Sequence, residues 1–179
     1  MDQDLLNQYF KDKWKSRFHE HERTGISLAN QIHDGQLVLD VGCGNNNFKG
    51  HIKNLIGIDP VFEDADVMTT IEDYVSESLF DVALCLDSMI FGSREHVENQ
   101  IEKLISLMKP SSTIHFRSNS LSEKHRYDKA GIETFYWTQE DHYGLSNKFG
   151  YRLFAFYPDR KGCEDEILHT IWIRNQGAV

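Results

Sequence analysis

The segment Val38–Gly50, VLDVGCGNNNFKG, places one acid, two glycines and three consecutive asparagines directly after a short apolar run. Gly42 and Gly44 can adopt backbone angles that other residues avoid, and they allow a ligand to approach the main chain closely. Asparagine tolerates left-handed backbone angles, and its amide can hydrogen-bond an amino-acid-like group. The segment therefore predicts a ligand-binding loop, with a plain turn between two elements as the alternative.

Asp59 is the second residue that could do chemistry, because it ends the next apolar run, NLIGID. A carboxylate at that position can accept the protons of both hydroxyl groups of a ribose, although an acid before Pro60 could also simply begin a turn. A dinucleotide fingerprint, GxGxxG, would need glycine where Asn47 stands. The pattern therefore favours a nucleoside ligand without a pyrophosphate and disfavours an NAD-linked oxidoreductase.

The apolar periodicity predicts the elements that position these residues. Short apolar bursts bounded by glycine, proline or acids indicate strands, and a spacing of three and four indicates helices. The expected strands span 36–41, 54–60, 80–89, 112–118, 151–158 and 167–174, and the expected helices span 95–108 and 138–149. Strands alternating with helical segments predict an α/β fold with a parallel sheet, whose last two strands form an antiparallel pair.

The carboxyl ends of parallel strands gather at one edge of such a sheet, where the ligand crevice forms. The residues that follow the strands are therefore expected to lie together: Gly42–Asn47, Asp59-Pro60, Asp87-Ser88 and Arg117–Asn119.

The N-terminal region predicts a helix over residues 2–22, with Leu5, Leu6, Tyr9, Phe10, Trp14 and Phe18 on one face. This aromatic stripe is expected to pack against the core, or to cover the ligand pocket as a lid. A short helix is expected over Ser27–His33 with Ser27 as its N-cap. His19 and His21 diverge at a spacing of two, which indicates a solvated face and no metal pair.

The composition describes an acidic chain of 179 residues with a net charge of −9 and a pI near 5.4. We expect a single domain, with a helical segment at 1–34 and a core at 35–179, and we do not expect nucleic acid as a partner. Cys43, Cys85 and Cys163 show no CxxC spacing, and no signal peptide or membrane-length apolar run is present. These features favour the cytoplasm.

Four stretches in register resemble the class I S-adenosylmethionine-dependent methyltransferases: VLDVGCGNNNF, LIGIDP, LFDVALCLDSMI and LMKPSSTIHF. The resemblance covers about Leu37 to Ile114, and the two late strands fit the end of that family's sheet. It implies a Rossmann-like, doubly wound, mostly parallel seven-stranded sheet with helices on both faces and an antiparallel last strand. It also implies S-adenosyl-L-methionine as the cofactor and methyl transfer as the reaction.

The same resemblance implies which residues contact the cofactor. The loop would lie against its methionine part, Asp59 and Pro60 against the ribose, the TTIEDY stretch against the adenine, and the end of the third strand against the methyl group. The implied cofactor-binding residues are Asp40, Gly42, Cys43, Gly44, Asn46, Asp59, Pro60, Ile71, Glu72, Asp87 and Ser88. Purely structural interpretations are also open for two further members of this set, since Cys43 could be a small apolar filler and Ile71 a core residue.

Two departures from the family pattern affect this interpretation. Asn46 stands where the family's third glycine usually lies. The path from Asp59 to Asp81 is too short for a full crossover helix, so the adenine side is expected to be open.

Methyl transfer needs mainly alignment, and it needs a base only if the attacking atom starts out protonated. The candidate bases at the predicted edge are Asp87, His115, Glu140, Asp141 and His142. Asp87 is preferred because it ends a buried strand, although it could instead cap the following segment.

The acceptor is expected to be a small molecule or a glycan-linked group. After the expected strand 80–89, the chain lacks the NPPY-like and Pro-Cys patterns of many nucleic-acid methylases. Asp87 and Asn119 alone do not predict a metal site. We expect the aromatic segment Ile132–Gly144 to form the acceptor wall. The readings left open are an active methyltransferase, a catalytically weak methyltransferase-like binding or partner-supporting subunit, and the disfavoured oxidoreductase.

Overall fold

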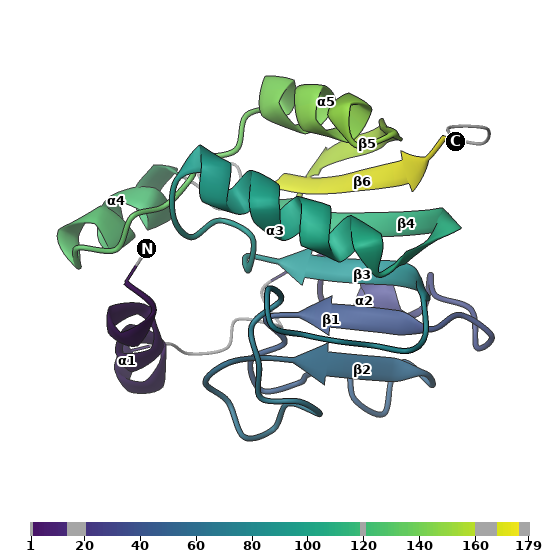
Figure 1. Cartoon of the computed structure of the whole chain (residues 1–179), viewed down its shortest axis with the longest axis horizontal. Helices are drawn as coiled ribbons and strands as arrows, with labels where there is room; N and C mark the ends of the chain where they lie inside the picture. The colour runs from purple at the N-terminus through teal and green to yellow at the C-terminus, as the bar shows by residue number, and fades with distance from the viewer. Residues whose placement is uncertain (1, 14–20, 119–120, 160–167, 176–179) are drawn as a thin grey trace.

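The computed structural model describes residues 2–13, 21–118, 121–159 and 168–175, and its centre is one mixed sheet (Figure 1). The described residues form six strands in the order β2-β1-β3-β4-β6-β5. Their bounds are β1 Val38–Val41, β2 Leu55–Ile58, β3 Phe80–Leu86, β4 Met108–Ser118, β5 Tyr151–Pro158 and β6 Leu168–Arg174. Strands β2, β1, β3 and β4 pair in parallel, and β6 is antiparallel to β4 and β5. The doubly wound α/β fold with an antiparallel last strand is therefore confirmed.

The sheet has six strands in the described part of the chain, whereas seven were predicted. The difference lies at the outer edge of β2, where Asp66 and Val67 cover Gly57. The Gly57 amide donates to the Asp66 carboxylate at 2.9 Å, and the Gly57 carbonyl accepts from the Asp66 and Val67 amides. Ile58 and Val67 also form one isolated parallel bridge, so a single bridge and the Asp66 side chain take the place of a seventh strand at this edge. Residues 61–79 contain no helix, as the short path between the two strands predicted.

Two apolar layers enclose the sheet. Helices α3 (Arg94–Ser106) and α5 (Gln139–Lys148) lie on one face, as Figure 1 shows, and they cover the larger hydrophobic cluster. On the other face, the single turn of α2 (Ile26–Ala29) and the turns of 42–54 cover a smaller cluster around Val38, Val82 and Leu84. The two neighbours Val38 and Leu39 belong to different clusters, since successive residues of a strand point to opposite faces.

Several boundaries differ from the predictions for local reasons. Helix α1 spans Gln3–Lys13; residues 21–25 are not helical, and Trp14 and Phe18 lie outside the described residues. Gly25, not Ser27, is the N-cap of α2, because the Ser27 hydroxyl donates to the Glu22 carbonyl. Helix α4, Leu121–Lys129, has little amphipathic signal and was not predicted.

Helices α1 and α4 lie at the edge where the parallel strands end (Figure 1). The aromatic rings of the N-terminal stripe join them. Tyr9 contacts the Tyr127 ring edge-to-face at 5.6 Å, and Phe91 contacts Phe10 and Tyr127 at 5.3 Å each. The predicted packing role of Tyr9 and Phe10 is thereby confirmed, and the same contacts place α1 over the sheet edge.

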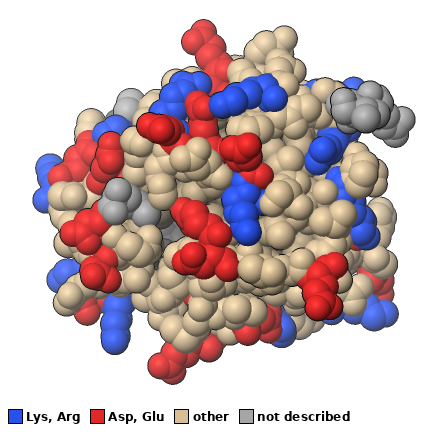
Figure 2. All heavy atoms as spheres, viewed as in Figure 1, with Lys and Arg blue, Asp and Glu red and all other residues tan. Residues whose placement is uncertain are grey.

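Acidic and basic side chains are interspersed on the face seen in Figure 2. Among the described residues, no helix combines the length and apolarity needed to cross a membrane.

Candidate functional site

A cavity of about 940 Å³ opens at the carboxyl ends of β1, β2 and β3. Two sets of residues face each other across it. We call the first the strand wall; it consists of Gly42, Gly44, Asp59, Pro60, Asp87 and Ser88. We call the second the helix wall; it consists of Gln3, Leu6, Asn7, Tyr9, Phe10 and Lys13 of α1, with Arg126, Tyr127, Lys129 and Ala130 of α4 and the residue after it.

The glycine loop needs its glycines for two separate reasons. Gly42 and Gly44 have φ angles of 68° and 54°, in the left-handed region that side chains disfavour. A Cβ atom on Gly42 would also lie 2.5 Å from the Ser88 Cβ atom, so the loop passes the end of β3 without room for a methyl group. The amides of Gly42 and Cys43 both donate to the Ile58 carbonyl, which joins the loop to β2. The result is a bare stretch of main chain at the cavity surface.

Asn46 occupies the glycine position of the family pattern without disturbing the loop. Its φ angle is 51°, so it adopts the left-handed conformation that glycine would supply. Its side-chain amide points away from the cavity and donates to the Asp64 carbonyl at 2.9 Å. Cys43 is buried beside it over Gly57, and burial raises the pKa of its thiol. Neither residue lines the cavity, so both support the loop from behind.

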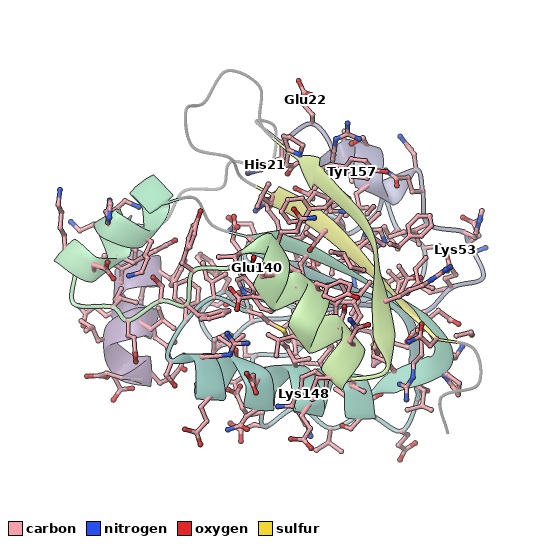
Figure 3. The ribbon with its side chains drawn as sticks, turned by 90° about the horizontal axis from the view of Figure 1, so that it is seen from above. His21, Glu22, Lys53, Glu140, Lys148 and Tyr157 are labelled. Atoms are coloured by element: carbon pink, nitrogen blue, oxygen red, sulfur yellow. The ribbon has the colours of Figure 1, made fainter. Side chains whose placement is uncertain are left out.

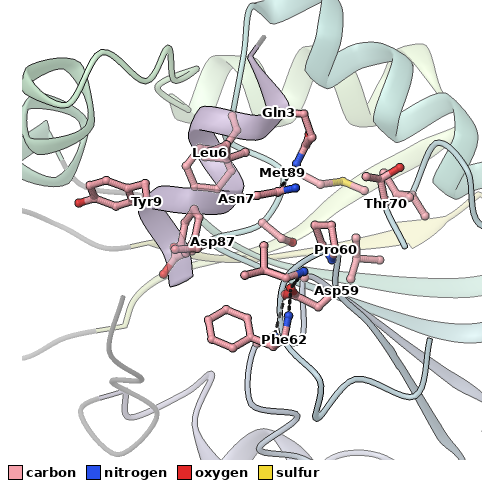
Figure 4. A pocket seen from close by; sticks show the side chains of 18 of the residues that line it. Gln3, Leu6, Asn7, Tyr9, Asp59, Pro60, Phe62, Thr70, Asp87 and Met89 are labelled. Atoms are coloured by element: carbon pink, nitrogen blue, oxygen red, sulfur yellow. Dashed lines mark hydrogen bonds between the residues drawn. The ribbon is translucent and has the colours of Figure 1, made fainter. Parts of the chain in front are cut away.

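Asp59 joins the glycine loop to the turn after β2. One carboxylate oxygen accepts from the Gly44 amide at 3.0 Å, and the other accepts from the Val61 and Phe62 amides at 2.8 and 3.1 Å (Figure 4). A carboxylate has about four acceptor positions. Three are in use, so the arrangement leaves room for one hydroxyl donor and not for the two that were expected.

Asp40, also expected at the cofactor, lies behind the glycine loop and does not line the cavity. Burial raises the pKa of Asp40 to about 7, although the nearby Arg117 guanidinium opposes the rise.

Residues 69–72 form one end of the cavity, where the adenine was expected. Ile71 is only 4% exposed and belongs to the main core cluster while also lining the cavity, so the two interpretations of this residue coincide. Glu72 accepts a hydrogen bond from the Gln100 amide at 2.8 Å and lies 3.3 Å from His96 Nε2.

Asp87 and Ser88 stand at the end of β3, facing the middle of the cavity. Asp87 has a φ angle of 61°, and its Oδ2 atom accepts from Arg117 Nε at 2.8 Å. Asp87 Oδ1 and Ser88 Oγ are buried without a hydrogen-bond partner in the described part of the chain. Buried polar atoms are rarely left unpaired, so these two indicate a place for a polar ligand group. Ser93, not Asp87, caps α3.

A series of hydrogen-bonded side chains that the sequence did not predict extends from Asp87. Arg117 bonds Asp87 with one nitrogen and the Thr24 hydroxyl with another, at 3.0 Å. The Thr24 hydroxyl in turn donates to the Asp159 carboxylate. Burial alone would raise the pKa of Asp159, but interactions with His21, Thr24 and the Arg23 amide lower it.

His21 lies at the far end of this series of hydrogen-bonded side chains, beside the end of β5 (Figure 3). It was expected on a solvated face. It is instead 7% exposed, lines the cavity, and places Nδ1 3.5 Å from Asp159 Oδ2. Nδ1 has no hydrogen-bond partner among the described residues, and an imidazole beside a buried carboxylate can accept a proton from a bound molecule. No local pattern could have identified this pair, because its members lie at opposite ends of the chain; His19 falls outside the described residues.

The other candidate bases do not line the cavity. His115 of β4 and His142 of α5 are both buried, and burial lowers the pKa of each to about 3. Asp141 forms the capping box of α5 with Thr138, and Glu140 is exposed on the same helix (Figure 3). Within the described residues, no cluster of three or more His, Cys, Asp or Glu is placed to hold a metal ion.

The expected acceptor wall, 132–144, also lies away from the cavity. Its central residue, Trp137, is 1% exposed, stacks on His142 at 4.3 Å and donates to the Met89 carbonyl at 2.8 Å. Trp137 thus fills the core beside α5, whereas Tyr143 of the same segment is 64% exposed. The helix wall, and not the segment 132–144, borders the part of the cavity where the acceptor was expected.

No protein-family model matches the sequence, and no curated protein matches it. The fold nevertheless resembles solved structures over nearly the whole chain. Magnesium protoporphyrin IX methyltransferase from Synechocystis PCC 6803, with bound S-adenosylmethionine, has a TM-score of 0.69 at 13% identity and covers 98% of both chains. The N-methyltransferase NodS from Bradyrhizobium japonicum WM9, with S-adenosylhomocysteine, has a TM-score of 0.70 at 14% identity, covering 97% of this chain and 98% of NodS.

A third example is the 1,6-didemethyltoxoflavin-N1-methyltransferase of Burkholderia thailandensis, with a TM-score of 0.71 at 11% identity, covering 97% of this chain and 89% of the other. The chain therefore has the Rossmann-like fold of the class I S-adenosylmethionine-dependent methyltransferases.

Proposed function

We propose that the protein is a methyltransferase that uses S-adenosyl-L-methionine to methylate a small-molecule or glycan-linked acceptor. The observation on which this mainly rests is the junction of the strand wall. The glycine loop at the end of β1 donates a hydrogen bond from Gly44 to the buried Asp59 at the end of β2, and both border one large cavity. The volume of about 940 Å³ is at the upper end of the range for small-molecule sites, so a cofactor and an acceptor fit side by side.

The residues of the cavity suit the chemical groups of this cofactor. The exposed backbone at Gly42 and Gly44 suits an amino-acid moiety, and the free acceptor position of Asp59 suits a ribose hydroxyl. The apolar face of Ile71 suits an adenine ring. We assign cofactor contacts to the members of the expected set that line the cavity: Gly42, Gly44, Asp59, Pro60, Ile71, Glu72, Asp87 and Ser88. Asp40, Cys43 and Asn46 would act by supporting the loop.

When bound, the cofactor would supply a methyl group attached to a positively charged sulfur. An electron-rich acceptor atom would bond to the methyl carbon while the carbon–sulfur bond breaks and its electrons stay on the sulfur. The protein's own contribution is alignment of the two reacting groups. The ion pair with Arg117 holds the Asp87 side chain in place at the end of β3. His21, oriented by Asp159, is the group that we assign to receive a proton from a protonated acceptor.

Calorimetric titration of the full chain with S-adenosylmethionine, S-adenosylhomocysteine and NAD tests the proposal. Both sulfur compounds should bind with one site per chain, and NAD should not compete with them. If neither sulfur compound binds, the proposal is rejected. Binding of NAD alone would support an oxidoreductase instead.

A further inference from the structure

The helix wall presents a regular face to the cavity. The residues of α1 that line it include Gln3, the neighbours Leu6 and Asn7, then Phe10 and Lys13; counted through either neighbour, the successive intervals are three or four. Such intervals place side chains on one face of a helix. Figure 4 shows Gln3, Leu6, Asn7 and Tyr9 around the pocket, opposite Asp59 and Pro60. One continuous face of α1 therefore bounds the half of the cavity that the proposed cofactor contacts do not use.

Aromatic rings form the inner part of this half. Tyr9, Phe10, Phe91 and Tyr127 all line the cavity, and they pack against one another mainly edge-to-face. Phe91 and Tyr127 are about 5% exposed, which leaves their rings little freedom to move. A fixed wall of rings suits a flat, apolar ring compound, because offset and edge-to-face contacts add to the gain from burial.

Positive charge is concentrated on the same wall. Lys13, Arg126 and Lys129 line the cavity from α1 and α4. Among the described side chains of these helices, the acids Asp4, Asp12 and Asp128 do not line it. This segregation stands out in a chain whose net charge is −9. A cavity wall of one sign raises the local concentration of ligands of the opposite sign.

The acids that do line the cavity belong to its other side, and protein groups already bond each of them. Asp59 accepts hydrogen bonds from backbone amides, Glu72 accepts one from Gln100, and Asp87 accepts one from Arg117. Their charges are therefore partly offset where they stand. Lys13, Arg126 and Lys129 line the acceptor half, and none of the acids whose side chains are described on α1 and α4 lines the cavity with them.

We propose that the acceptor is a flat ring compound bearing an anionic group such as a carboxylate, with the ring against Tyr9, Phe10 and Tyr127 and the anion near Lys13, Arg126 and Lys129. This inference rests on the proposed function, because it assigns the acceptor to the half of the cavity beyond the cofactor contacts.

The test uses the full chain saturated with S-adenosylhomocysteine and three probes that share one ring system: 2-naphthoate, neutral 2-naphthamide and cationic 2-naphthylmethylammonium. Calorimetry should show that naphthoate binds about tenfold more tightly than naphthamide, the gain expected for one charge-assisted contact, and that the cation binds most weakly. The preference should shrink as the salt concentration rises from about 50 to about 500 mM, because the cations are partly exposed to solvent.

A pair of matched variants identifies the responsible charges. The double variant Lys13→Gln with Lys129→Gln should lose most of the preference for naphthoate while its affinity for S-adenosylhomocysteine stays within about twofold. The control is Lys11→Gln with Lys124→Gln, which removes the same charge from the same two helices at positions that do not line the cavity. The control should keep the preference.

The outcomes separate the two proposals. Failure of S-adenosylhomocysteine to bind would reject the methyltransferase function itself. If S-adenosylhomocysteine binds, the acceptor class is overturned by any of three results: naphthoate binds no better than naphthamide, the cationic probe binds best, or none of the probes binds at millimolar concentration. Equal loss of preference in the variant and its control would also overturn it, since only long-range charge would then be involved.

Discussion

The two walls of the cavity are built in different ways. The strand wall is made of main chain and short side chains, and hydrogen bonds tie its glycine loop to β2 and the turn after it, as those from Gly44 to Asp59 and from Gly42 to Ile58 show. The helix wall is made of long side chains on two helices that pack on the sheet edge through aromatic rings. Changes in the strand wall should therefore alter folding and cofactor binding together, whereas changes at the polar and charged positions of the helix wall should alter acceptor binding alone.

Gly42→Ala should give the largest effect. The new Cβ would lie 2.5 Å from Ser88 Cβ at a φ angle of 68°, so strain and overpacking should together lower the free energy of unfolding by about 3 kcal/mol. Urea denaturation measures the loss, and calorimetry should show weakened binding of S-adenosylhomocysteine in the same variant.

Two other glycines provide matched controls for this variant. Gly50 has a φ angle of 83° with nothing within 4 Å of an added Cβ, so Gly50→Ala should cost only the backbone strain, about 1 kcal/mol. Gly35 has neither feature, and Gly35→Ala should change stability by less than about 0.5 kcal/mol. A Gly42→Ala variant no less stable than Gly50→Ala would show that the loop does not press on β3.

The pH dependence of stability should reveal the acid buried behind the strand wall. The folded chain holds the Asp40 proton up to pH about 7, whereas the unfolded chain releases it near the ordinary value of 3.8. The folded state therefore binds more protons between these values, and this residue's contribution falls as the pH rises from about 4 to about 7.

Asp40→Asn removes that titration, so the stability of the variant relative to wild type should rise by about 2 kcal/mol between pH 5 and pH 8. Denaturation curves at the two pH values measure the change. A constant difference between variant and wild type at both pH values would mean that Asp40 is ionised throughout, and that burial does not govern its pKa.

Asp59→Ala should affect both folding and binding. Losing the acceptor of three backbone amides should lower the free energy of unfolding by about 1–2 kcal/mol. Affinity for S-adenosylhomocysteine should fall about tenfold, equivalent to about 1.4 kcal/mol, if the remaining acceptor position binds a ribose hydroxyl. Asp59→Asn keeps one acceptor oxygen and should lose less on both counts. An unchanged affinity in Asp59→Ala refutes the ribose role.

Variants of the helix wall should give the smallest change. Asn7→Ala and Lys129→Gln should each alter the free energy of unfolding by less than about 0.5 kcal/mol and the affinity for S-adenosylhomocysteine by less than about twofold. The reason is that both side chains face the cavity from helices outside the sheet. A loss of cofactor affinity as large as that of Asp59→Ala would contradict the separation of the two walls.

The sequence by itself determined the strand wall. Its residues lie at or just beyond the ends of apolar strands, and the parallel strands of one sheet end at the same edge. Local pattern and chain order were therefore enough to bring Gly42, Asp59 and Asp87 together. The left-handed conformation of Asn46 was also within reach, since asparagine tolerates that backbone region.

For Tyr9 and Phe10 the sequence left open whether they pack on the core or cover the pocket, and in the fold both rings do both. Tertiary structure alone decided the rest of the helix wall and the His21–Asp159 pair. Their members come from the two ends of the chain and from a helix with weak amphipathic pattern, and no local signal encodes which distant segments will pack at the open edge of a sheet. The same limit explains the aromatic segment 132–144, because an aromatic run looks alike in sequence whether it lines a cavity or fills a core. Burial depends on the segments that meet there, and only the folded chain brings them together.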